Sequence, residues 1–409
     1  MLVAAPRKGS KDARHVTEHL EELNRLVDTA GAEVVGRISQ QITSPNPATL
    51  IGEGKVEEVA AAVVAAGATL VIFDEELSPV QGANLERELK VRVMDRPEVI
   101  LDIFSTRARS HEAKLQVELA QLEYMLPRLA GRGVEMSQLG GGIGTRGPGE
   151  TQLETDRRKI YRRVRHVKEQ LEEVRRIRRQ QRARRESVPV PVVALVGYTN
   201  AGKSTLFNAL TKAGVLESAQ MFATLDPTLR GLTLPSRRKI LLSDTVGFIR
   251  NLPHTLVTSF RATLEEVQRA ALLLHVADAA DPTAQEQAVQ VEKVLAELEV
   301  MDKPRLIVRN KIDLVPEEER ARMRPAGDEV AVSAISGEGM DGLLKKMDEM
   351  LTADPIVRVK LRVPQSEGKV LAQIEADAKI LKRSYRGGVV HVELEASESM
   401  ARRWKEFER

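Results

Sequence analysis

The chain has 409 residues, 42% of them hydrophobic and 30% charged, and a formal net charge of +3. Such a composition predicts a globular protein of two to four domains and excludes a disordered or fibrous chain. The absence of cysteine excludes disulfides and thiolate metal sites. No apolar run reaches the roughly 18–20 residues of a membrane span. The first six residues also lack the apolar core of a signal peptide. We therefore expect no membrane span and a cytoplasmic location.

Residues 1–108 alternate between strand-like and helix-like patterns. The patterns predict strands at residues 2–5, 32–39, 69–74 and 91–95, and helices at residues 16–30, 55–66 and 80–90. Their alternation predicts a parallel α/β subdomain. The stretch Gly52-Glu53-Gly54-Lys55 precedes one of these helices and offers glycines and a lysine to a phosphate group. It lacks the spacing of a complete phosphate loop, so a turn that leads into the helix is the favoured interpretation.

Residues 109–187 show the pattern of a long antiparallel helical hairpin. Two apolar stripes recur every three or four residues, as a seam between two helices requires. The first stripe is Leu115, Leu119, Leu122, Leu126 and Leu129, and the second is Ile160, Val164, Val167, Leu171, Val174 and Ile177. Residues 130–152, between the stripes, contain eight glycines. A connection of this length in a compact protein is more often functional or disordered than passive.

Positive charge is concentrated in the second helix of this hairpin. Residues 157–185 contain 14 Lys or Arg and three Glu, a local net charge of +11 that leaves −8 for the rest of the chain. This field favours a polyanionic partner. Because the chain has only 12 aromatic residues, phosphate contact is favoured over base stacking. We interpret the basic helices and their glycine-rich tip as an RNA probe; the alternative is a solvated helix face with a passive linker.

Residues 188–352 begin with a valine-rich strand at residues 192–196 that leads directly into a phosphate-binding loop of the form GxxxxGK[ST], followed by a helix at residues 206–212. Its glycines let backbone N–H groups face phosphate oxygens, and the helix N-terminus adds the positive end of its dipole. Lys203 is expected to bridge the β- and γ-phosphates, and the Ser204 hydroxyl to ligate Mg²⁺. The loop consists of Gly197, Tyr198, Thr199, Asn200, Ala201, Gly202, Lys203, Ser204 and Thr205.

A second strand, at residues 239–243, delivers a DxxG motif. Asp244 is expected close to Mg²⁺, beyond its direct ligands, and the Gly247 N–H is expected at the γ-phosphate. The motif consists of Asp244, Thr245, Val246 and Gly247. Many GTPases place a glutamine directly after it to orient the attacking water. Here that residue is Phe248, which predicts slow intrinsic hydrolysis until a partner or a reordered loop completes the site. For the nearby Arg250 and His254, a role at the loop surface is favoured over catalysis.

Two further strand ends indicate that the base is guanine. A strand at residues 306–309 ends in Asn310, Lys311, Ile312 and Asp313. The Asp313 carboxylate can accept hydrogen bonds from guanine N1 and N2, a donor pair that adenine lacks. Ser333, Ala334 and Ile335 follow a strand at residues 329–332, where a backbone N–H can donate to guanine O6. A phosphate loop, DxxG, NKxD and SA in this order predict a small GTPase domain.

A loop that senses the γ-phosphate through Mg²⁺ is expected between the phosphate loop and Asp244. Thr224 is the favoured metal ligand there, and Thr228, which follows a proline, is the alternative. We expect the nucleotide to be bound by this loop at Phe222, Ala223, Thr224, Leu225 and Asp226. The residues assigned to catalysis are Lys203, Thr224 and Gly247, and the metal ligands are Ser204 and Thr224.

The remaining residues predict a small C-terminal α+β domain. Strands are expected at residues 357–363 and 389–395, and helices at residues 369–384 and from Ser397 onwards. The expected fold class is thus α/β. It comprises an N-terminal parallel α/β subdomain (1–108) with a long helical hairpin (109–187), a P-loop GTPase domain (188–352) and a C-terminal α+β domain (355–409). The GTPase domain is expected to be a mostly parallel sheet with helices on both faces.

The chain resembles the HflX family of ribosome-associated GTPases in motifs that extend beyond the nucleotide site. N-terminal signatures of the family are similar to Leu77-Ser78-Pro79, Leu101-Asp102-Ile103-Phe104, Gln116-Val117-Glu118-Leu119-Ala120 and Pro127-Arg128-Leu129. The stretch Gly52-Glu53-Gly54-Lys55 also fits. Residues 140–154 resemble the glycine-rich loop of the family, and residues 222–228 and 244–250 resemble its switch segments. The resemblance covers residues 1–352.

This resemblance implies a GTPase that binds the ribosome, chiefly the large subunit and its RNA, through the basic hairpin and the glycine-rich loop. It implies splitting or rescue of stalled or stress-inactivated ribosomes in the GTP state, with hydrolysis as the reset and Mg²⁺ as the cofactor. We expect a monomer without a DNA partner. The alternative is a nucleotide-switched regulator of a protein partner, such as a membrane protease. A GTPase coupled to RNA modification is least favoured, because the sequence shows no second catalytic centre.

Overall fold

The computed structural model describes residues 1–137, 148–183, 190–212, 221–251, 264–320, 323, 327–351 and 355–408. Contacts divide this part of the chain into two units. The first contains the described residues up to 177 together with residues 221–225 and Asn251, and the second contains the others. The four-part division expected from the sequence stays a prediction, because these two units cut across it.

The first unit contains a parallel sheet in the order β2-β1-β3-β4. Its strands are β1 (Leu2–Ala4), β2 (Arg37–Ser39), β3 (Leu70–Phe73) and β4 (Arg92–Asp95). The helices between them are α1 (Lys11–Arg14), α2 (Val16–Thr29), α3 (Glu53–Ala66) and α4 (Pro79–Leu89). Val71, Ile72 and Phe73 are all buried, as expected of a parallel strand covered on both faces. The predicted parallel α/β layer is confirmed.

Two details of this unit differ from the prediction. The strand predicted at residues 32–39 is formed only by Arg37–Ser39, because its partner β1 pairs Leu2 with Arg37 and Ala4 with Ser39. Residues further upstream therefore have no strand beside them. The sequence analysis also missed helix α5 (Arg96–Arg107), in which Asp95 caps the N-terminus by accepting a hydrogen bond from the Glu98 N–H.

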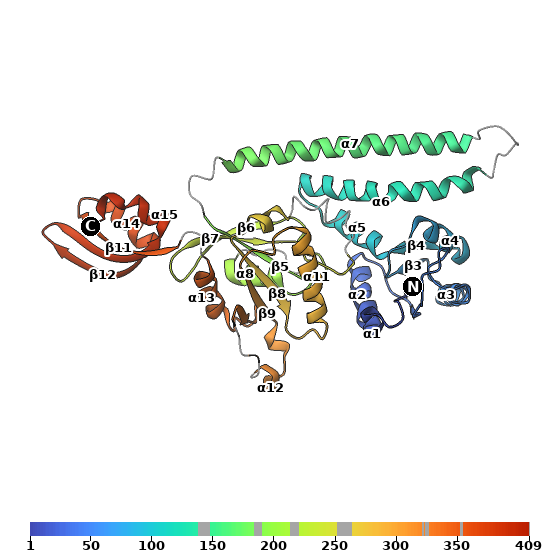
Figure 1. The fold of residues 1–409 in the computed structure, drawn as a ribbon, viewed down its shortest axis with the longest axis horizontal. Coiled ribbons are helices and arrows are strands. Elements are labelled where there is room, and N and C mark those ends of the chain that lie inside the picture. Colours follow the sequence, from blue (N-terminus) through green and yellow to red (C-terminus); the bar gives the residue numbers. More distant parts are fainter. Residues whose placement is uncertain are drawn as a thin grey trace. The chain divides into compact units, whose positions relative to one another are not determined.

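Helices α6 (His111–Ser137) and α7 (Pro148–Ala183) form the predicted antiparallel hairpin (Figure 1). Its seam is the cluster of Leu115, Leu119, Val167 and Leu171, with Leu122, Val164 and Val174 partly buried beside it. Ile177, expected in the second stripe, is instead 43% exposed. Most of the glycine-rich loop at residues 140–149, up to Gly147, lies outside the described residues.

The second unit contains a sheet in the order β10-β9-β8-β5-β7-β6, in which β6 alone pairs antiparallel. Its strands are β5 (Val192–Gly197), β6 (Thr228–Thr233), β7 (Lys239–Asp244), β8 (Leu272–Asp278), β9 (Arg305–Asn310) and β10 (Glu329–Ala331). Its helices are α8 (Lys203–Thr211), α10 (Glu265–Arg269), α11 (Ala284–Glu297), α12 (Glu317–Arg320) and α13 (Met340–Met350), with a 3₁₀ turn at Ile312–Leu314. In this order β5 is an interior strand, with β8 on one side and β7 on the other.

Helices cover both faces of this sheet. Val193 and Leu195 of β5 pack in one cluster with side chains of α8 and α13. Ala194 and Val196 alternate with them and are equally buried, and α10 and α11 contact β5. The predicted mostly parallel sheet with helices on both faces is therefore confirmed, and the carboxyl ends of β5, β8, β9 and β10 meet along one edge.

The second unit also contains an antiparallel sheet in the order β11-β13-β12. Its elements are β11 (Ile356–Pro364), α14 (Gly368–Asp377), β12 (Lys379–Arg386), β13 (Val389–Ser397) and α15 (Glu398–Arg403), with a 3₁₀ turn at Lys405–Phe407. The predicted helix at residues 369–384 is wrong beyond Asp377. From Lys379 the chain pairs with β13 through a turn at Gly387 and Gly388, both with positive φ. Such a glycine pair favours a hairpin over a continuing helix.

Within the described parts of the chain, no helix has the length and apolar character needed to cross a membrane.

Candidate nucleotide-binding site

The phosphate loop connects β5 to α8, and its glycines are required by close approaches. A Cβ on Gly197 would lie 2.2 Å from the Val276 carbonyl oxygen. Gly202 adopts φ +88, and a Cβ there would lie 2.3 Å from the Asn310 amide nitrogen. Asn200 also has a left-handed conformation, with φ 61. These close approaches restrict the backbone conformation of the loop, which leads directly into the N-terminus of α8.

Lys203, the first residue of α8, is buried at the inner side of this loop. Its Nζ donates hydrogen bonds to the carbonyl oxygens of Gly197 (3.1 Å) and Tyr198 (2.7 Å). Burial lowers the pKa of the ammonium group to about 8, and the Asp244 carboxylate acts in the opposite direction. An ammonium has three N–H donors, so these two bonds leave one for a phosphate oxygen. The side chain is therefore held in place before any nucleotide arrives.

Ser204 and Asp244 join the loop to the end of β7. The Ser204 hydroxyl donates a hydrogen bond of 2.8 Å to Asp244 Oδ2, and Asp244 is fully buried. The Thr245 hydroxyl donates to the Leu195 carbonyl, which fixes the start of the DxxG motif against β5. Hydroxyl and carboxylate oxygens are the ligand types that Mg²⁺ prefers, so this pair fits the ion that the sequence predicts.

Gly247 brings the DxxG motif into contact with the phosphate loop. A Cβ at this position would lie 2.7 Å from Thr199 Cα and 2.9 Å from Lys203 Nζ. The next residue, Phe248, donates its N–H to the Gly197 carbonyl, and its own carbonyl accepts from Thr199 N–H. Its side chain is 1% exposed. Phe248 therefore supports the phosphate loop through its backbone, and its ring offers no hydrogen bond to a water molecule.

Arg250 corrects one interpretation from the sequence. It was expected at the loop surface, but it is 7% exposed, and its backbone N–H donates to the Tyr198 hydroxyl at 2.9 Å. Its segment is thus anchored beside the phosphate loop. His254 lies outside the described residues.

The predicted guanine-binding segments lie at the ends of β9 and β10. Asn310 connects them to the phosphate loop, because its side chain donates to the Ala201 carbonyl (3.0 Å) and accepts from the Ala334 N–H (3.1 Å). Ser333 is buried, whereas Ile335, which follows it after β10, and Asp313, which follows β9, are exposed. A polar group and an exposed apolar side chain at one edge match what a purine ring requires.

Asp278 belongs to this site, although the sequence analysis did not select it. It ends β8, and its carboxylate forms an ion pair of 2.7 Å with Lys311 Nζ. The sequence did offer a signal for Asp278, because the apolar run at residues 270–274 predicts a strand. In a parallel sheet, the carboxyl end of that strand lies beside Asn310 at the end of the next one. His275, in the same strand, was also missed. Burial lowers its pKa to about 4, so it is neutral at pH 7.

The structure brings together the predicted residues of the phosphate loop, the DxxG motif, Asn310, Lys311, Ser333 and Ala334. Asp226 lies in the same unit, separated from the start of β6 by Pro227. The other predicted loop residues, Phe222 to Leu225, belong to the first unit. There the Phe222 ring meets the Phe104 ring edge-on at 4.7 Å, and the Met221 N–H donates to the Thr29 hydroxyl. The proposed role of Thr224 as a metal ligand therefore stays a prediction.

Comparison with known proteins identifies the family. Three family models match: "GTP-binding GTPase N-terminal" over residues 17–105, "GTP-binding GTPase Middle Region" over residues 107–185, and "50S ribosome-binding GTPase" over residues 192–311. The GTPase HflX of Caldanaerobacter subterraneus subsp. tengcongensis is 47% identical over 95% of this chain and 90% of its own length. That of Escherichia coli is 48% identical, over 86% and 83%. The chain belongs to the HflX family of GTPases.

A solved structure is also similar. It is a GTP-binding protein from the archaeon Sulfolobus solfataricus in complex with GDP, 28% identical, with a TM-score of 0.43, covering 86% of this chain and 99% of that one. The resemblance stated from the sequence is thus confirmed by the curated relatives. As a member of this family the chain is a GTPase, and it belongs to a group described as ribosome-binding.

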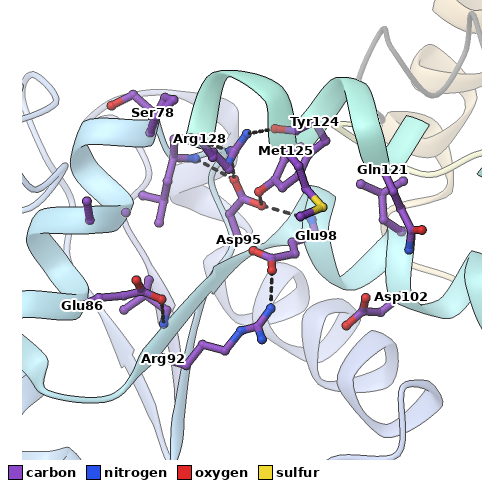
Figure 2. Close-up of a pocket in the computed structure, with 16 residues that line it drawn as sticks. Ser78, Glu86, Arg92, Asp95, Glu98, Asp102, Gln121, Tyr124, Met125 and Arg128 are labelled. Atoms are coloured by element: carbon purple, nitrogen blue, oxygen red, sulfur yellow. Dashed lines mark hydrogen bonds and ion pairs between the residues drawn. The ribbon is translucent and has the colours of Figure 1, made fainter. Parts of the chain in front are cut away.

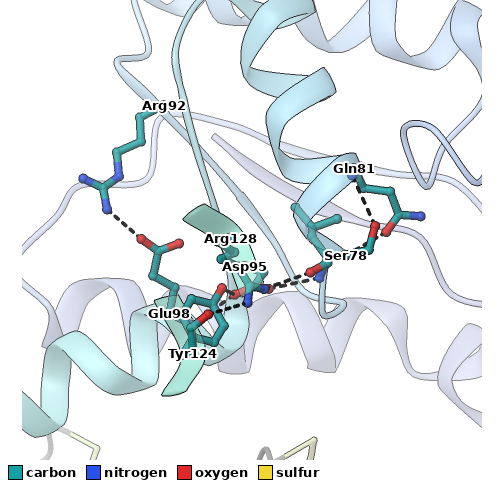
Figure 3. Close-up of polar contacts among 8 residues, drawn as sticks. Ser78, Gln81, Arg92, Asp95, Glu98, Tyr124 and Arg128 are labelled. Atoms are coloured by element: carbon teal, nitrogen blue, oxygen red, sulfur yellow. Dashed lines mark hydrogen bonds and ion pairs between the residues drawn. The ribbon is translucent and has the colours of Figure 1, made fainter. Parts of the chain in front are cut away.

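The first unit of this GTPase contains a cavity of about 390 Å³ between α4, α5 and α6 (Figure 2). Asp95 is its structural centre, because it accepts hydrogen bonds from the Leu77 N–H, the Tyr124 hydroxyl and the Arg128 guanidinium (Figure 3). The Arg128 guanidinium also lies 3.5 Å from the centre of the Tyr124 ring. These bonds fasten α6 to the end of β4.

The charges of this cavity disfavour a second phosphate site. Its walls carry the carboxylates of Glu86, Asp95, Glu98 and Asp102 against two guanidinium groups. Both guanidinium groups already pair with carboxylates, Arg92 with Glu98 at 2.6 Å and Arg128 with Asp95 at 3.0 Å. Burial raises the pKa of the Glu98 and Asp102 carboxyl groups. We assign the network a structural role in holding the hairpin to the sheet.

Proposed function

We propose that this GTPase binds the large ribosomal subunit through its RNA in the GTP state and splits stalled or stress-inactivated ribosomes into subunits. Hydrolysis of GTP then resets the protein. In this proposal it acts in the cytoplasm as a monomer. The observation that carries the proposal is the basic face of α7 in a chain whose GTPase segment matches the ribosome-binding model.

The arginines of α7 support contact with RNA phosphates. Arg157, Arg158, Arg162 and Arg165 are exposed along the helix. Those that pair with glutamates do so mainly within the helix, as Arg158 does with Glu154 and Arg165 with Glu169. Exposed pairs of this kind are worth little, about 0.3–0.5 kcal/mol, so a phosphate can replace the glutamate at small cost. The predicted RNA partner therefore fits the charge of this helix.

The nucleotide site supports a switch. In the proposal, Lys203 binds the β- and γ-phosphates, Gly247 N–H contacts the γ-phosphate, and Ser204 and Thr224 hold Mg²⁺. The ion would neutralise phosphate charge when bound. Asp313 accepts hydrogen bonds from guanine, and the backbone near Ala334 donates to its O6. Loss of the γ-phosphate removes the contacts that order the two switch segments.

Hydrolysis by the free protein is expected to be slow. The buried Phe248 ring stands where many GTPases have a glutamine that orients water. Its backbone hydrogen bonds to Gly197 and Thr199 hold it against the phosphate loop. A ribosome that repositions the segment after Gly247 would then act as the trigger for hydrolysis.

The test is sedimentation of intact bacterial ribosomes mixed with the full chain and either a non-hydrolysable GTP analogue or GDP. Separation into subunits with the analogue alone would establish nucleotide-gated splitting. Ribosomes that stay intact but carry the protein would refute splitting and leave a ribosome-bound sensor. If the protein fails to co-sediment in either state, ribosome binding is refuted and a protein partner becomes the better explanation.

A further inference from the structure

The C-terminal sheet has one face that helices cover and one that they do not. Val390, Val392 and Leu394 of β13 are buried in a cluster with Ile374 of α14 and with α15 side chains. Successive residues of a strand point to opposite faces. His391, Glu393 and Glu395 therefore lie on the other face, which we term the open face.

The strand register assembles this open face from three strands. Glu395 lies between Arg358 and Lys379, Glu393 between Lys360 and Lys382, and His391 between Arg362 and Ser384. The last row pairs Val389 with Pro364 and Arg386. The open face thus carries six Lys or Arg side chains and two Glu. A hollow of about 470 Å³ lies at its middle rows, and its lining includes Lys360, Arg362, Lys382, His391 and Glu393.

Only part of this positive charge is neutralised within the described chain. Glu393 pairs with Arg358 at 3.0 Å and with Lys360 at 3.9 Å, and Glu395 pairs with Lys379 at 3.4 Å. No ion pair among the described residues involves Arg362, Lys382 or Arg386, and all three are exposed. The excess cations lie at the hollow and along its rim, where an anionic partner would meet them.

The pattern fits a chain of phosphates better than a single anion. Cations on one face of a strand recur every two residues, about 6.6–6.8 Å apart, and the rows cross three strands. The open-face rows contain no Phe, Tyr or Trp, since Tyr385 pairs with Val390 and so faces the other side, and His391 is their one aromatic ring. One ring beside six cations favours contact through the backbone phosphates over base stacking for these rows.

We propose that the open face of the C-terminal sheet is a second RNA-binding surface that contacts the phosphate backbone without reading sequence. The inference rests on the proposed function, which supplies ribosomal RNA as the ligand. Two separate basic surfaces on one chain give avidity, since binding of the first raises the local concentration of RNA at the second.

A matched pair of charge reversals tests this surface. Arg362→Glu with Lys382→Glu changes the open face, and Lys369→Glu with Lys405→Glu makes the same change in net charge outside the sheet. Lys369 lies in α14 and Lys405 in the 3₁₀ turn, and both are exposed. The full chain, loaded with a non-hydrolysable GTP analogue, is titrated against protein-free large-subunit RNA and against intact large subunits at several salt concentrations. Circular dichroism checks that each variant folds.

The expected result is about tenfold weaker RNA binding for the open-face variant near physiological salt, with a salt slope smaller by about two. The control should stay within about twofold of the unsubstituted chain. Equal losses in both variants, or no loss in either, would overturn the proposal, as would absence of RNA binding by the unsubstituted chain. A loss on intact subunits alone would instead indicate a ribosomal protein as the partner and also overturn it. An open-face-specific loss on RNA, with no binding to subunits by any variant, would refute the proposed function and retain this surface.

Discussion

Gly202-Lys203 and Gly54-Lys55 both lie at the start of a helix, and their surroundings differ. At Gly202-Lys203 the glycine has φ +88 and touches Asn310, and the lysine is buried against two carbonyl groups. At Gly54-Lys55 nothing lies within 4 Å of a Cβ built on the glycine, and Lys55 pairs with Glu58 of its own helix at 2.5 Å. The difference shows that the ends of neighbouring strands, together with the complete GxxxxGK[ST] spacing, distinguish the phosphate loop from an ordinary helix start.

The largest effect should come from the two lysines. Lys203→Ala removes the one buried ammonium group of the described phosphate loop, and we expect GTP affinity to fall about 100-fold or more, since hydrogen bonds to charged groups contribute roughly 1.5–3 kcal/mol each. Lys55→Ala serves as the matched control and should leave affinity unchanged. Equilibrium titration with a fluorescent GTP analogue measures both. An unchanged affinity for Lys203→Ala would refute the phosphate-loop assignment.

The next effect concerns the base. Asp313→Asn should weaken GTP binding by roughly 10- to 100-fold, because a neutral amide replaces the carboxylate that accepts from guanine N1 and N2. The same variant should gain affinity for xanthosine triphosphate, because its C2 carbonyl can accept a hydrogen bond from the introduced amide, whereas the C2 amino group of guanine donates one to the carboxylate. Competition between the two nucleotides measures the preference. Retained preference for GTP would remove Asp313 from the site.

A smaller effect is expected at the glycines. Gly247→Ala introduces a Cβ 2.7 Å from Thr199 Cα, so the phosphate loop or the DxxG motif must shift. We expect about tenfold slower GTP hydrolysis, because small displacements at a reacting centre are costly. Gly54→Ala meets open space and replaces a glycine within α3, so it should keep activity and slightly raise the melting temperature. Equal activity in the two variants would show that the close approach at Gly247 is not needed.

The smallest effect is the pH dependence of nucleotide binding. The pKa of Lys203 is lowered to about 8 in the protein, so raising the pH from 7 to 8.5 converts most of the ammonium to neutral amine. Affinity for GTP should fall about fourfold over this range, since the charged form binds phosphate. Residual binding by Lys203→Ala should lack this step. A flat profile for the unsubstituted chain would indicate that the nucleotide does not contact Lys203.

The sequence predicted those parts of the site that lie at strand ends with a known motif. Lys203, Ser204, Asp244 and Asn310 meet because parallel strands end at one edge of the sheet, which spacing alone indicates. It could not predict that Arg250 is buried or that Asp278 pairs with Lys311, because both depend on the packing of distant segments.

The fold was predictable where apolar residues repeat regularly. The hairpin seam followed from the leucines of α6 and the valines of α7. Strand β12 was mistaken for helix because its exposed residues are mostly charged, and only pairing with β13 decides its conformation. The Gly387-Gly388 turn was the one local signal for that hairpin.

The contact between Phe222 and Phe104 limits how far the neighbouring Thr224 can travel. Phe222 is 2% exposed, and its ring meets the Phe104 ring at 4.7 Å within the first unit. Two residues of fully extended chain span at most about 7 Å. Thr224 therefore stays within that radius of the Phe222 backbone for as long as the Phe222 ring stays buried. A longer movement of Thr224 requires the Phe222 ring to leave its buried position, at a cost of roughly 1.5–3 kcal/mol. The packing of Phe222 inside the first unit therefore limits how far the loop around Thr224 can move.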